Sequence, residues 1–488
     1  FGDILRIGYQ NRPKLFAIDI QLPEMLYSDV IEIDERLDPH GYITKPLNEK
    51  NTEKQLQKYF VDGYRTLAIA LMHGYRYPEH EKKIATIAKR IGFTQISISH
   101  QVSPLMKIIP RGDTTVLDAY LSPVLRRYVN QVESALGIEA KQTGRLMFMQ
   151  SNGGLTDARF FAGKDAILSG PAGGVVGMAK TAKAAGFNKL IGFDMGGTST
   201  DVSHFAGDYE RAFETEVAGI RCCAPMMLIH TVAAGGGSIL HFDGSRYRVG
   251  PDSAGANPGP ACYRNGGPLT ITDCNVMLGK LDPDFFPKVF GPEADQPLDS
   301  EVVKEKFSHL TKQIENATGK PITPQEVAEG FLSVAIDNMS NAIKKISVQR
   351  GHDVSDYTLS CFGGAGAQHA CLVADNLGIK QIHLHPFAGV LSAFGIGLAD
   401  TRTINDMAIE AQLDHQLITT ISLEFKTLKQ RGVEDLSAQG LKISTLIHHQ
   451  RVYIRYLGSD TAIAVTFNDL KELIKEFESI HFDRFGFT

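Results

Sequence analysis

The sequence predicts an α/β protein whose sheets mix parallel and antiparallel strands. Residues 65–99 and 357–385 each have the pattern strand–helix–strand, which places the two strands of a unit parallel. Residues 190–204 have an apolar run, a Gly-Gly pair and then β-branched residues, the pattern of two antiparallel strands joined by a tight turn. At 488 residues, with 43% hydrophobic and 22% charged residues, the chain is long enough for roughly two to four soluble globular domains.

The first strand–helix–strand unit is followed by a long helix. Residues 65–72 form an apolar strand, and the helix at 78–91 has acidic residues in its first turn and basic residues in its last, as the helix dipole favours. The second strand follows at 95–99. An amphipathic helix is expected over 113–136, broken or kinked at Pro123.

The hairpin at 190–204 is the strongest candidate for a functional site. Its first strand ends near Asp194, and a second acid, Asp201, follows the glycines and hydroxyl residues. A P-loop would continue from its glycines into a helix and would carry Gly-Lys-Ser/Thr. Here the β-branched residues predict a returning strand, and the alternating residues at 211–217 predict the third strand of the same meander.

The turn of this hairpin has the groups that bind phosphate. Backbone N–H groups and hydroxyls can donate to phosphate oxygens, and Asp194 and Asp201 could hold Mg²⁺, directly or through water. An ordinary glycine turn between two strands is the alternative interpretation. The candidate phosphate-binding residues of the turn are Gly196, Gly197, Thr198, Ser199 and Thr200.

Three further glycine clusters lie at the ends of predicted elements. The run at 169–177 leads into a small-residue helix at 178–185, where it could seat an anion or let two helices pack closely; packing is the favoured interpretation. The cluster at 231–238 ends a strand-like segment. The glycines at 363–366 join a strand to a helix, but His369 stands where a dinucleotide fingerprint has its last glycine, which excludes NAD. Such a loop still suits the sugar or base of a nucleotide.

The C-terminal half contains a core helix and a less glycine-rich region. An apolar face at helical spacing predicts the helix over 323–349. Further on, strands are expected at 451–456 and 462–467, followed by a charged helix at 469–480.

The six cysteines and two alternating histidines are weak candidates for metal or redox chemistry. No two cysteines form a C-x-x-C pair, so buried thiols in a reducing compartment are expected rather than disulfides. His383 and His385 alternate on a strand, and one buried and one exposed ring is the favoured interpretation. The cysteines are Cys222, Cys223, Cys262, Cys274, Cys361 and Cys371.

Composition excludes two classes of partner. With a net charge of −5, a pI near 6.4 and no basic run interleaved with aromatics, neither nucleic acid nor an anionic membrane surface is expected. The most apolar C-terminal stretch, 387–399, is too short to span a bilayer, and no signal peptide is visible. The expected location is therefore cytoplasmic.

Several motifs, taken in their order along the chain, form a combined pattern: they lie at 7–13, 71–75, 168–177, 192–203, 231–238, 253–263, 350–353 and 362–370. Together they resemble the hydantoinase/oxoprolinase family, and the resemblance covers nearly the whole chain. Within the family, residues 22–27 and 30–36 favour the branch that opens 5-oxo-L-proline over the N-methylhydantoinase and acetone-carboxylase relatives.

This resemblance implies an actin-like ATPase fold, similar to sugar kinases and chaperone ATPases. Two lobes of that fold close on ATP, and each offers one Asp-Gly-Gly-Thr hairpin to the phosphates. The implied division is 1–110 for the remainder of the N-terminal lobe, 111–402 for the ATPase core and 403–488 for the start of a C-terminal α+β region. The implied cofactors are ATP and Mg²⁺.

The resemblance also implies roles for individual residues. Asp194 and Asp201 are implied as the catalytic pair and as the magnesium ligands, within the second of the two phosphate hairpins. The glycines at 363–366 are implied as the adenosine loop, and those at 235–238 as a lining of the same cleft. The implied nucleotide-binding residues are Gly196, Gly197, Thr198, Ser199, Thr200, Gly235, Gly236, Gly237, Ser238, Gly363, Gly364, Ala365 and Gly366.

The first phosphate hairpin of the family has no counterpart in this sequence. Asp62-Gly63 and Asp243-Gly244 come nearest, and neither continues as Gly-Thr. We therefore expect the chain to be part of a longer one and to lack ATP turnover by itself.

The implied activity is ATP-dependent opening of the cyclic amide 5-oxo-L-proline to L-glutamate, through phosphorylation of the amide oxygen. In the family, hydrolysis of the activated ring is associated with a hydantoinase B-type subunit or a fused C-terminal half, so a partner and an oligomeric assembly are expected. The alternatives are an N-methylhydantoinase or acetone-carboxylase type of ATPase subunit, and a non-catalytic, nucleotide-responsive scaffold. Arg111, Arg246 and Arg264 could pair with the substrate carboxylate, or equally lie at a surface or interface.

Overall fold

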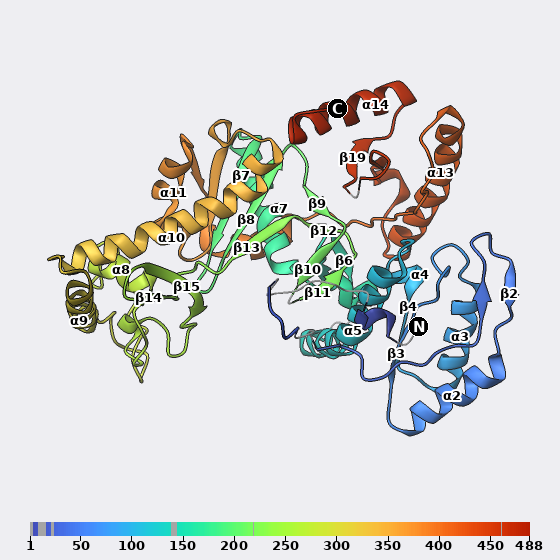
Figure 1. Cartoon of the computed structure of the whole chain (residues 1–488), viewed down its shortest axis with the longest axis horizontal. Coiled ribbons are helices and arrows are strands. Elements are labelled where there is room, and N and C mark those ends of the chain that lie inside the picture. The colour runs from blue at the N-terminus through green and yellow to red at the C-terminus, as the bar shows by residue number, and fades with distance from the viewer. Residues whose placement is uncertain (1–2, 8–15, 21–23, 138–143, 218, 460) are drawn as a thin grey trace. The chain divides into compact units, whose positions relative to one another are not determined.

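The computed structural model describes residues 3–7, 16–20, 24–137, 144–217, 219–459 and 461–488 (Figure 1). Most of the family motif at 7–13 and the first two residues of 22–27 lie outside this range. The chain forms two compact units, and each is assembled from separate segments. Unit 1 comprises 1–169, 211–227 and 400–477, and unit 2 comprises 170–210, 228–399 and 478–488.

Unit 1 contains the first strand–helix–strand unit as predicted. Strands β3 (Thr66–Ile69) and β4 (Gln95–Ile98) pair in parallel and are connected by α3 (Glu79–Ile91). Gly92, in the left-handed region at φ 115°, ends α3. The core of this part consists of Leu56, Ile69, Ile84, Ile87, Ala88 and Phe93.

Helix α5 (Ile108–Leu136) is not broken at Pro123; a break was one of the two outcomes expected there. It begins five residues before the predicted start at 113 and continues unbroken through the proline. Leu117 and Val129 are buried on either side of Pro123, so packing outweighs the hydrogen bond that proline removes.

The other elements of unit 1 are short strands and further helices. The strands at 451–456 and 462–467 are confirmed as an antiparallel pair, although both are shorter than predicted. The remaining elements are α1 (Ile4–Ile7), β1 (Arg36–Leu37), β2 (Ile43–Lys45), α2 (Glu49–Val61), α4 (Ser99–Val102), β5 (Met147–Met149), β6 (Leu155–Asp157), β9 (Arg211–Ala212), β10 (Thr215–Val217), β11 (Ile220–Cys222), β12 (Met226–Met227), α13 (His415–Ala438), β18 (Arg451–Ile454) and β19 (Ile463–Thr466); α14 (Leu470–Phe485) runs on past the last residue of the unit.

Unit 2 is built around a five-stranded mixed sheet in the order β13-β8-β7-β16-β17. Strands β7 (Lys189–Met195) and β8 (Thr200–Ala206) form the predicted hairpin, and β13 (Ile229–Val232) pairs antiparallel with β8. Strands β16 (Thr358–Phe362) and β17 (Gln381–Leu384) continue the sheet parallel to β7, with α11 (Ala370–Leu377) between them. The prediction of an α/β protein with mixed sheets is confirmed.

The third strand of the meander was predicted wrongly. Residues 211–217 do form strands, but β9 pairs with β12 and β10 with β11, all within unit 1. The strand that pairs with β8 is β13, which follows these two strand pairs in the sequence. Alternation in a sequence indicates a strand but not its neighbour, because the neighbour is decided by long-range packing.

The glycine run at 169–177 lies inside helix α7 (Ser169–Ala184) rather than before it. It packs against α12 (Leu391–Leu398). A Cβ atom on Gly177 would lie 2.6 Å from the carbonyl oxygen of Leu391, and one on Gly173 would lie 2.7 Å from that of Ser392. The two backbones therefore touch, which confirms the packing interpretation over the anion-binding one.

The longest helix of unit 2, α10 (Pro324–Ile346), begins at a capping box formed by Thr323 and Glu326 and ends three residues before the predicted boundary. Its inner face packs into the main core, which includes Phe193, Phe307 and Phe331. The other elements of unit 2 are β14 (Ser238–Phe242), β15 (Tyr247–Ser253), α8 (Ile271–Met277) and α9 (Ser300–Thr318).

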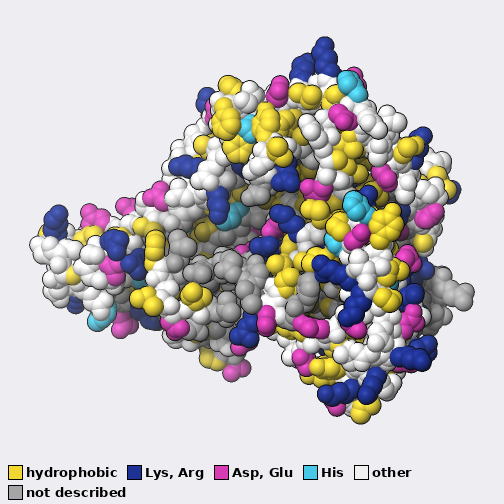
Figure 2. Space-filling view, turned by 45° about the vertical axis from the view of Figure 1, so that its right-hand side comes forward, with side chains coloured by type: hydrophobic (Ala, Val, Ile, Leu, Met, Phe, Trp, Pro, Cys, Tyr) yellow, Lys and Arg dark blue, Asp and Glu magenta, His cyan; other side chains and the backbone are white. Residues whose placement is uncertain are grey.

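Two expectations from composition can be compared with the structure. Within the described ranges, no helix is long and apolar enough to cross a membrane. All six cysteines are free thiols, and five are buried as expected. Cys371 is exposed, because its position on the short helix α11 faces away from the core; the prediction was wrong for this thiol. On the face drawn in Figure 2, Lys and Arg side chains are interspersed with acidic ones.

Candidate phosphate-binding site

Asp194 and Asp201 face each other across the β7–β8 hairpin. They are Cα partners in the antiparallel pairing, and such partners have Cβ atoms about 4.5–5.5 Å apart on the same face of the sheet. Both side chains are half-buried. On the next strand, Thr231 is the Cα partner of Asp201, and its Oγ1 donates to Asp201 Oδ1 at 2.5 Å.

The surroundings of the two carboxylates raise the pKa of both. Burial, and then the charge of Asp201, raise the pKa of Asp194 to about 6, while a hydroxyl of Ser392 at 3.5 Å acts weakly in the other direction. Burial also raises the pKa of Asp201, although Thr231 opposes this. A divalent cation would relieve both effects, and carboxylate oxygens are the ligands that Mg²⁺ prefers. The donor set therefore fits the expected metal.

The turn between the strands leaves backbone donors free. Gly196 N–H donates to Ser199 O at 3.1 Å. In the described part of the chain, the N–H groups of Gly197, Thr198 and Ser199 have no acceptor, and the first two residues are exposed. Consecutive free N–H groups in a turn form an anion-binding concavity.

The loop at 235–238 supports this turn from the buried side. Gly236 N–H donates to Gly196 O at 3.1 Å, and Gly237 N–H donates to Gly197 O at 2.6 Å. A Cβ atom on Gly235 would lie 2.6 Å from the backbone nitrogen of Thr198, so only glycine fits there.

Two hydroxyls of these two predicted segments are used internally. Ser238 Oγ accepts the N–H of Gly235 at 2.8 Å, and Thr200 Oγ1 donates to Ala234 O at 2.5 Å. The structure thus places Thr200 and the loop at 235–238 behind the turn, where they hold its shape.

The predicted adenosine loop begins beside Asp194. Phe362, the last residue of β16, is the Cα partner of Asp194, and Gly363 follows in the left-handed region at φ 84°. A Cβ atom on Gly363 would collide with the carboxylate of Asp194. Ala365 N–H donates to Met195 O at 2.9 Å, whereas Gly364 is exposed with open space around it.

Gly366 closes this loop on the buried side, where a Cβ atom would lie 2.9 Å from Cys361 Sγ. The structure therefore brings together all three predicted segments, 194–201, 235–238 and 363–366, within unit 2.

Two side chains of the site were missed from the sequence. Thr231 precedes a glycine cluster on an alternating strand, so its position facing an acid could have been inferred once β13 was paired with β8. Ser392 lies on α12, far along the chain, and no motif marks it.

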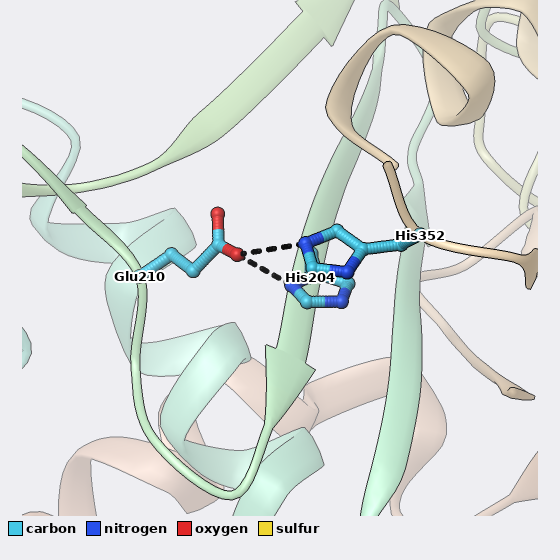
Figure 3. Close-up of side chains that lie close together, drawn as sticks. All are labelled: His204, Glu210 and His352. Carbon is cyan, nitrogen blue, oxygen red and sulfur yellow. Dashed lines mark hydrogen bonds and ion pairs between the residues drawn. The ribbon is translucent and has the colours of Figure 1, made fainter. Parts of the chain in front are cut away.

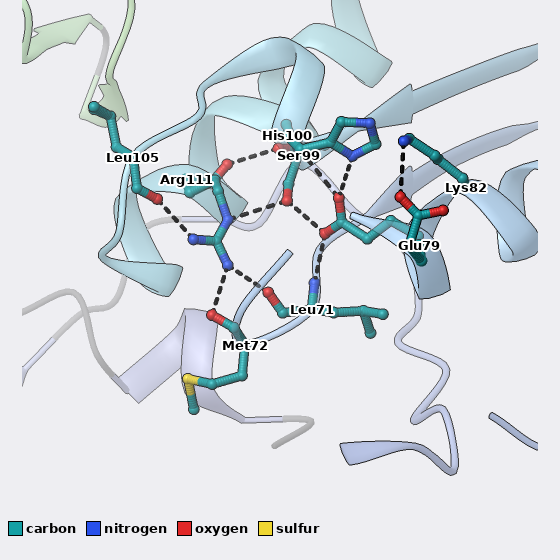
Figure 4. A network of polar contacts seen from close by, with 10 residues as sticks. Leu71, Met72, Glu79, Lys82, Ser99, His100, Leu105 and Arg111 are labelled. Atoms are coloured by element: carbon teal, nitrogen blue, oxygen red, sulfur yellow. Dashed lines mark hydrogen bonds and ion pairs between the residues drawn. The ribbon is translucent and has the colours of Figure 1, made fainter. Parts of the chain in front are cut away.

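Arg111 is committed to the fold of unit 1 and has no donor left for a substrate (Figure 4). It is fully buried, and all five of its N–H groups are used. Their acceptors are Ser99 Oγ (3.0 Å), Leu105 O (2.7 Å), Met106 O (3.0 Å), Leu71 O and Met72 O (3.1 Å).

The other two candidate arginines form ion pairs with nearby aspartates. Arg264 donates to Pro297 O at 2.7 Å and pairs with Asp299 at 2.8 Å. Arg246 is exposed and pairs with Asp243 at 3.7 Å. Neither lies within the three segments of the candidate site.

His204, Glu210 and His352 form a second polar cluster in unit 2 that the sequence did not indicate (Figure 3). His204 Nδ1 lies 2.7 Å from Glu210 Oε1, and His352 Nε2 lies 3.7 Å from the same oxygen. Arg350 Nη1 donates to the other oxygen at 2.5 Å, and Tyr357 Oη lies 2.9 Å from His204 Nε2.

This cluster contains residue types that bind metals, but its geometry is that of hydrogen-bonded ion pairs and not of a metal site. The His204 and His352 rings are stacked, with centroids 4.1 Å apart and planes inclined by 16°. Imidazole binds a metal in the ring plane, and two nearly parallel planes have no common point near both nitrogens. The Arg350 guanidinium further neutralises Glu210.

The two histidines proposed as weak metal candidates are both half-buried, so the expectation of one buried and one exposed ring was wrong. His383 Nδ1 lies 3.0 Å from Ser360 Oγ, and His385 stacks on Phe394. Along the described residues, neither histidine belongs to a group of three metal-ligating side chains.

Comparison with known proteins identifies relatives of this chain. The family model described as "Hydantoinase/oxoprolinase" matches residues 111–405, and that described as "Hydantoinase/oxoprolinase N-terminal region" matches residues 1–92. The chain is 40% identical over 521 residues to 5-oxoprolinase of Saccharomyces cerevisiae, covering 100% of this chain and 40% of that protein. It therefore spans about two-fifths of the length of this relative.

A second relative is a bacterial protein. The chain is 31% identical over 438 residues to caprolactamase subunit alpha of Pseudomonas jessenii, covering 87% of this chain and 61% of that protein. The crystal structure of ATP-dependent caprolactamase from Pseudomonas jessenii superposes with a TM-score of 0.82 at 28% identity, covering 99% of this chain and 71% of that one.

Proposed function

The chain belongs to the hydantoinase/oxoprolinase family, and on that premise we propose that it is the ATP-binding, substrate-phosphorylating part of an ATP-dependent 5-oxoprolinase. The complete enzyme would open 5-oxo-L-proline, a five-membered cyclic amide, to L-glutamate. Identity of 40% along the whole chain to a protein named 5-oxoprolinase supports this assignment. The likeness to an ATP-dependent caprolactamase supports the combination of ATP and a cyclic amide.

The observation that carries the proposal is the arrangement at the β7–β8 turn. Two half-buried acids face each other at the base of a turn that has three free N–H groups in the described part of the chain. In this proposal Gly197, Thr198 and Ser199 donate to phosphate oxygens. Asp194 and Asp201 hold magnesium, directly or through water.

We assign unit 2 to one lobe of an actin-like ATPase fold. The hairpin that carries the acids belongs to a mixed five-stranded sheet, and the glycine loop at 363–366 meets it at Asp194. That arrangement supports a phosphate hairpin and an adenosine loop on one lobe. The second phosphate-binding hairpin of such a fold would come from another part of the complete protein.

The chain's own residues would act by positioning and charge neutralisation, which phosphoryl transfer chiefly needs. Bound Mg-ATP supplies the phosphoryl group that activates the amide oxygen of the lactam. Thr231 fixes Asp201 through its hydrogen bond, and Gly235 and Gly363 keep side chains out of the space beside the turn and Asp194. The turn amides are oriented before ATP arrives, so their hydrogen bonds cost little reorganisation.

Hydrolysis of the activated ring is assigned to a second polypeptide or region, of the hydantoinase B type. The chain spans about 40% of the yeast 5-oxoprolinase, which leaves ample length there for a fused hydrolytic half. The name "Caprolactamase subunit alpha" indicates separate subunits in that relative. Both arrangements are compatible with the assignment.

The test is ATP hydrolysis by the complete enzyme with Mg²⁺, with and without 5-oxo-L-proline. We expect the lactam to stimulate hydrolysis and Asp194→Ala to abolish that stimulation. Asp295→Asn, which changes an exposed acid of the same unit, is the matched control. Stimulation that survives in Asp194→Ala would show that the hairpin is not the phosphate site.

A second candidate substrate is a different cyclic amide, which the match to caprolactamase over 99% of the chain favours. A panel of 5-oxo-L-proline, caprolactam, hydantoin and acetone separates this candidate and the other branches of the family, because each branch predicts a different stimulator. Binding of ATP without stimulation by any of them would instead favour the nucleotide-responsive scaffold.

A further inference from the structure

Glu81 and His100 form a hydrogen-bonded pair in unit 1, outside the candidate phosphate-binding site. Glu81 lies on α3 and is 0% exposed, and His100 lies on α4, the short helix that follows β4. Nδ1 of His100 lies 2.7 Å from Oε2 of Glu81, and the backbone N–H of His100 donates to the same oxygen at 3.2 Å. The side chain of His100 is 11% exposed, so its ring reaches the surface of this unit.

Glu81 decides which nitrogen of the ring carries the proton. Its other oxygen, Oε1, accepts the N–H of Leu71 at 2.9 Å and the hydroxyl of Ser99 at 2.6 Å (Figure 4). A carboxylate can only accept, so the proton of the bond to His100 is on Nδ1. Nε2 then presents its lone pair, and no hydrogen bond from another described residue occupies it. A carboxylate prepares a histidine to act as a general base in this way.

The pair lies at the carboxyl ends of two parallel strands. Leu71 comes two residues after the end of β3, and His100 comes two residues after the end of β4. Gly74 lets the loop after β3 pass over Glu81, because a Cβ atom on this glycine would collide with the carboxylate. Ligands of open α/β sheets bind outside the carboxyl ends of the strands.

The corresponding edge of unit 2 carries the candidate nucleotide site. The pairs β3–β4 and β16–β17 have the same parallel register, with Thr-Leu opposite Gln-Ile in both. Each connecting helix ends at a glycine in the left-handed region, Gly92 or Gly378. The loop after β16 meets Asp194, so the loop after β3 is its counterpart in unit 1. Imidazole and carboxylate groups line this edge of unit 1 where unit 2 has glycines, which suits a small polar substrate.

We propose that His100 is a catalytic base, which takes the amide proton of a lactam bound at the carboxyl ends of β3 and β4. Glu81 is its positioning residue. The inference rests on the proposed function, because the reaction is phosphorylation of the amide oxygen.

The reaction needs such a base. As the amide oxygen attacks the γ phosphorus of ATP, the π electrons of the carbonyl form the new O–P bond and ADP leaves. The N–H bond of the amide breaks, its electron pair forms a C=N bond, and the proton goes to Nε2 of His100. If the nitrogen kept its proton, the product would carry a positive charge next to the phosphorylated carbon, so removal of the proton favours the transfer.

The location is tested by a crystal structure of the complete protein with 5-oxo-L-proline and a non-hydrolysable analogue of ATP. We expect the amide nitrogen of the lactam within about 3.2 Å of Nε2 of His100. Lactam bound elsewhere on the protein would overturn the inference and leave the proposed function standing. If the lactam does not stimulate ATP hydrolysis by the wild-type enzyme, the proposed function falls, and the inference falls with it.

The proton transfer is tested by the rate of ADP formation at saturating 5-oxo-L-proline. Asparagine at position 100 can donate from its amide near the Nδ1 position and keep the contact with Glu81, but it has no counterpart of Nε2. We expect His100→Asn to lower kcat about 100-fold or more, while the KM for ATP changes less than about twofold. In His100→Ala, added imidazole should raise the rate roughly tenfold or more, because it replaces the base.

A kcat within about twofold of the wild type in His100→Asn would overturn the role of His100. Loss of activity without any rescue of His100→Ala by imidazole would show that the histidine is only structural. Glu81→Gln should lower kcat but change the KM for 5-oxo-L-proline less than about twofold, because its amide donates to Nδ1 and moves the ring proton to Nε2. If His100→Asn does not fold, the crystal structure and the imidazole rescue decide.

His80→Asn is the matched control. Nδ1 of His80 lies 2.7 Å from Oε2 of Glu35, so unit 1 has a second buried pair of the same kind. This pair joins α3 to the residue before β1 and does not lie at the end of a strand. We therefore expect His80→Asn to change kcat less than about twofold. An equal loss in both variants would mean that weakening unit 1 is enough, and would overturn the assignment of His100.

Discussion

Asp194 and Asp201 are direct partners across β7 and β8, and this proximity raises the pKa of Asp194 beyond what burial alone would do. The folded-state pKa is about 6, and the ordinary value is 3.8. Between these values the folded protein binds more protons than the unfolded chain, so stability without Mg²⁺ should fall as the pH rises through this window. Asp201 shifts in the same direction.

Asp194→Asn should therefore abolish activity yet stabilise the magnesium-free protein at pH 7, by up to about 2–3 kcal/mol. Mg²⁺ should raise the melting temperature of the wild type and leave that of the variant nearly unchanged. Thermal unfolding with EDTA or Mg²⁺, from pH 4 to pH 8, measures both effects. A variant that is less stable than the wild type in EDTA would contradict this account of the pair.

Glu210 gives the opposite dependence on pH. Burial by itself would raise its pKa, but the hydrogen bond from His204, the nearby His352 ring and the charge of Arg350 outweigh burial and bring the pKa to about 2, from an ordinary value of 4.5. This carboxylate thus contributes stability that is present above about pH 4.5 and is lost as the pH falls toward 2.

Glu210→Gln should cost roughly 3 kcal/mol at pH 7 and should flatten the acid limb of the stability curve. Denaturant unfolding at several pH values measures this, with Glu329→Gln, on the exposed side of α10, as control. Equal losses in both variants would mean that the cluster around Glu210 is not the cause.

The cluster of His204, Glu210 and His352 should not bind zinc. Its stacked rings cannot both direct a nitrogen lone pair to one ion, and Arg350 occupies the second oxygen of Glu210. Metal analysis of protein dialysed against Zn²⁺ should show no difference between the wild type and His352→Ala. One equivalent of zinc that disappears in His352→Ala would refute this interpretation.

Arg111→Met should destabilise unit 1 by about 3–5 kcal/mol, because four backbone carbonyls and Ser99 lose their donor in a buried site. Arg126→Met, on the exposed side of the same helix, should change stability by less than about 0.5 kcal/mol. Urea unfolding monitored by circular dichroism compares the two. If Arg111→Met were stable but had lost its affinity for 5-oxo-L-proline, the arginine would belong to the substrate site after all.

Glycine substitutions in α7 should separate helix propensity from packing. Gly177→Ala should destabilise the protein, because its Cβ atom meets the backbone of α12, whereas Gly170→Ala should stabilise it by up to about 1 kcal/mol, because no atom lies within 4 Å of its Cβ position. Melting temperatures of the two variants test this directly. A Gly177→Ala variant as stable as Gly170→Ala would mean that the helices can move apart at no cost.

Local signals explain what could be predicted from the sequence. The hairpin, both strand–helix–strand units and helix α10 were predicted because strand alternation, Gly-Gly, capping residues and helical spacing act within a few residues. The pairing of β13 with β8 could not be predicted in this way, because residues 211–227 intervene and form strand pairs of their own. The division of the chain at residues 110 and 402 stays a prediction.

The same distinction between local signals and long-range contacts applies to the residues of the candidate site. Asp194, Asp201 and the three glycine segments carry their own pattern, and they lie together in unit 2. Ser392 depends on a contact with Asp194, which lies about 200 positions earlier, and Thr231 depends on the pairing of β13 with β8. Arg111 was misjudged for the complementary reason: a basic residue looks available in a sequence until its acceptors are located.

The order in which the chain builds the central sheet of unit 2 has a consequence for synthesis. Leu190 of β7 pairs with Thr358 of β16, which leaves the ribosome about 170 residues later. At typical rates of translation, β7 waits on the order of ten to thirty seconds with the backbone N–H and C=O groups of one edge unpaired. During that interval the nascent chain exposes an unpaired strand, so its yield should depend on chaperones and temperature even though β7 is largely buried in the finished sheet.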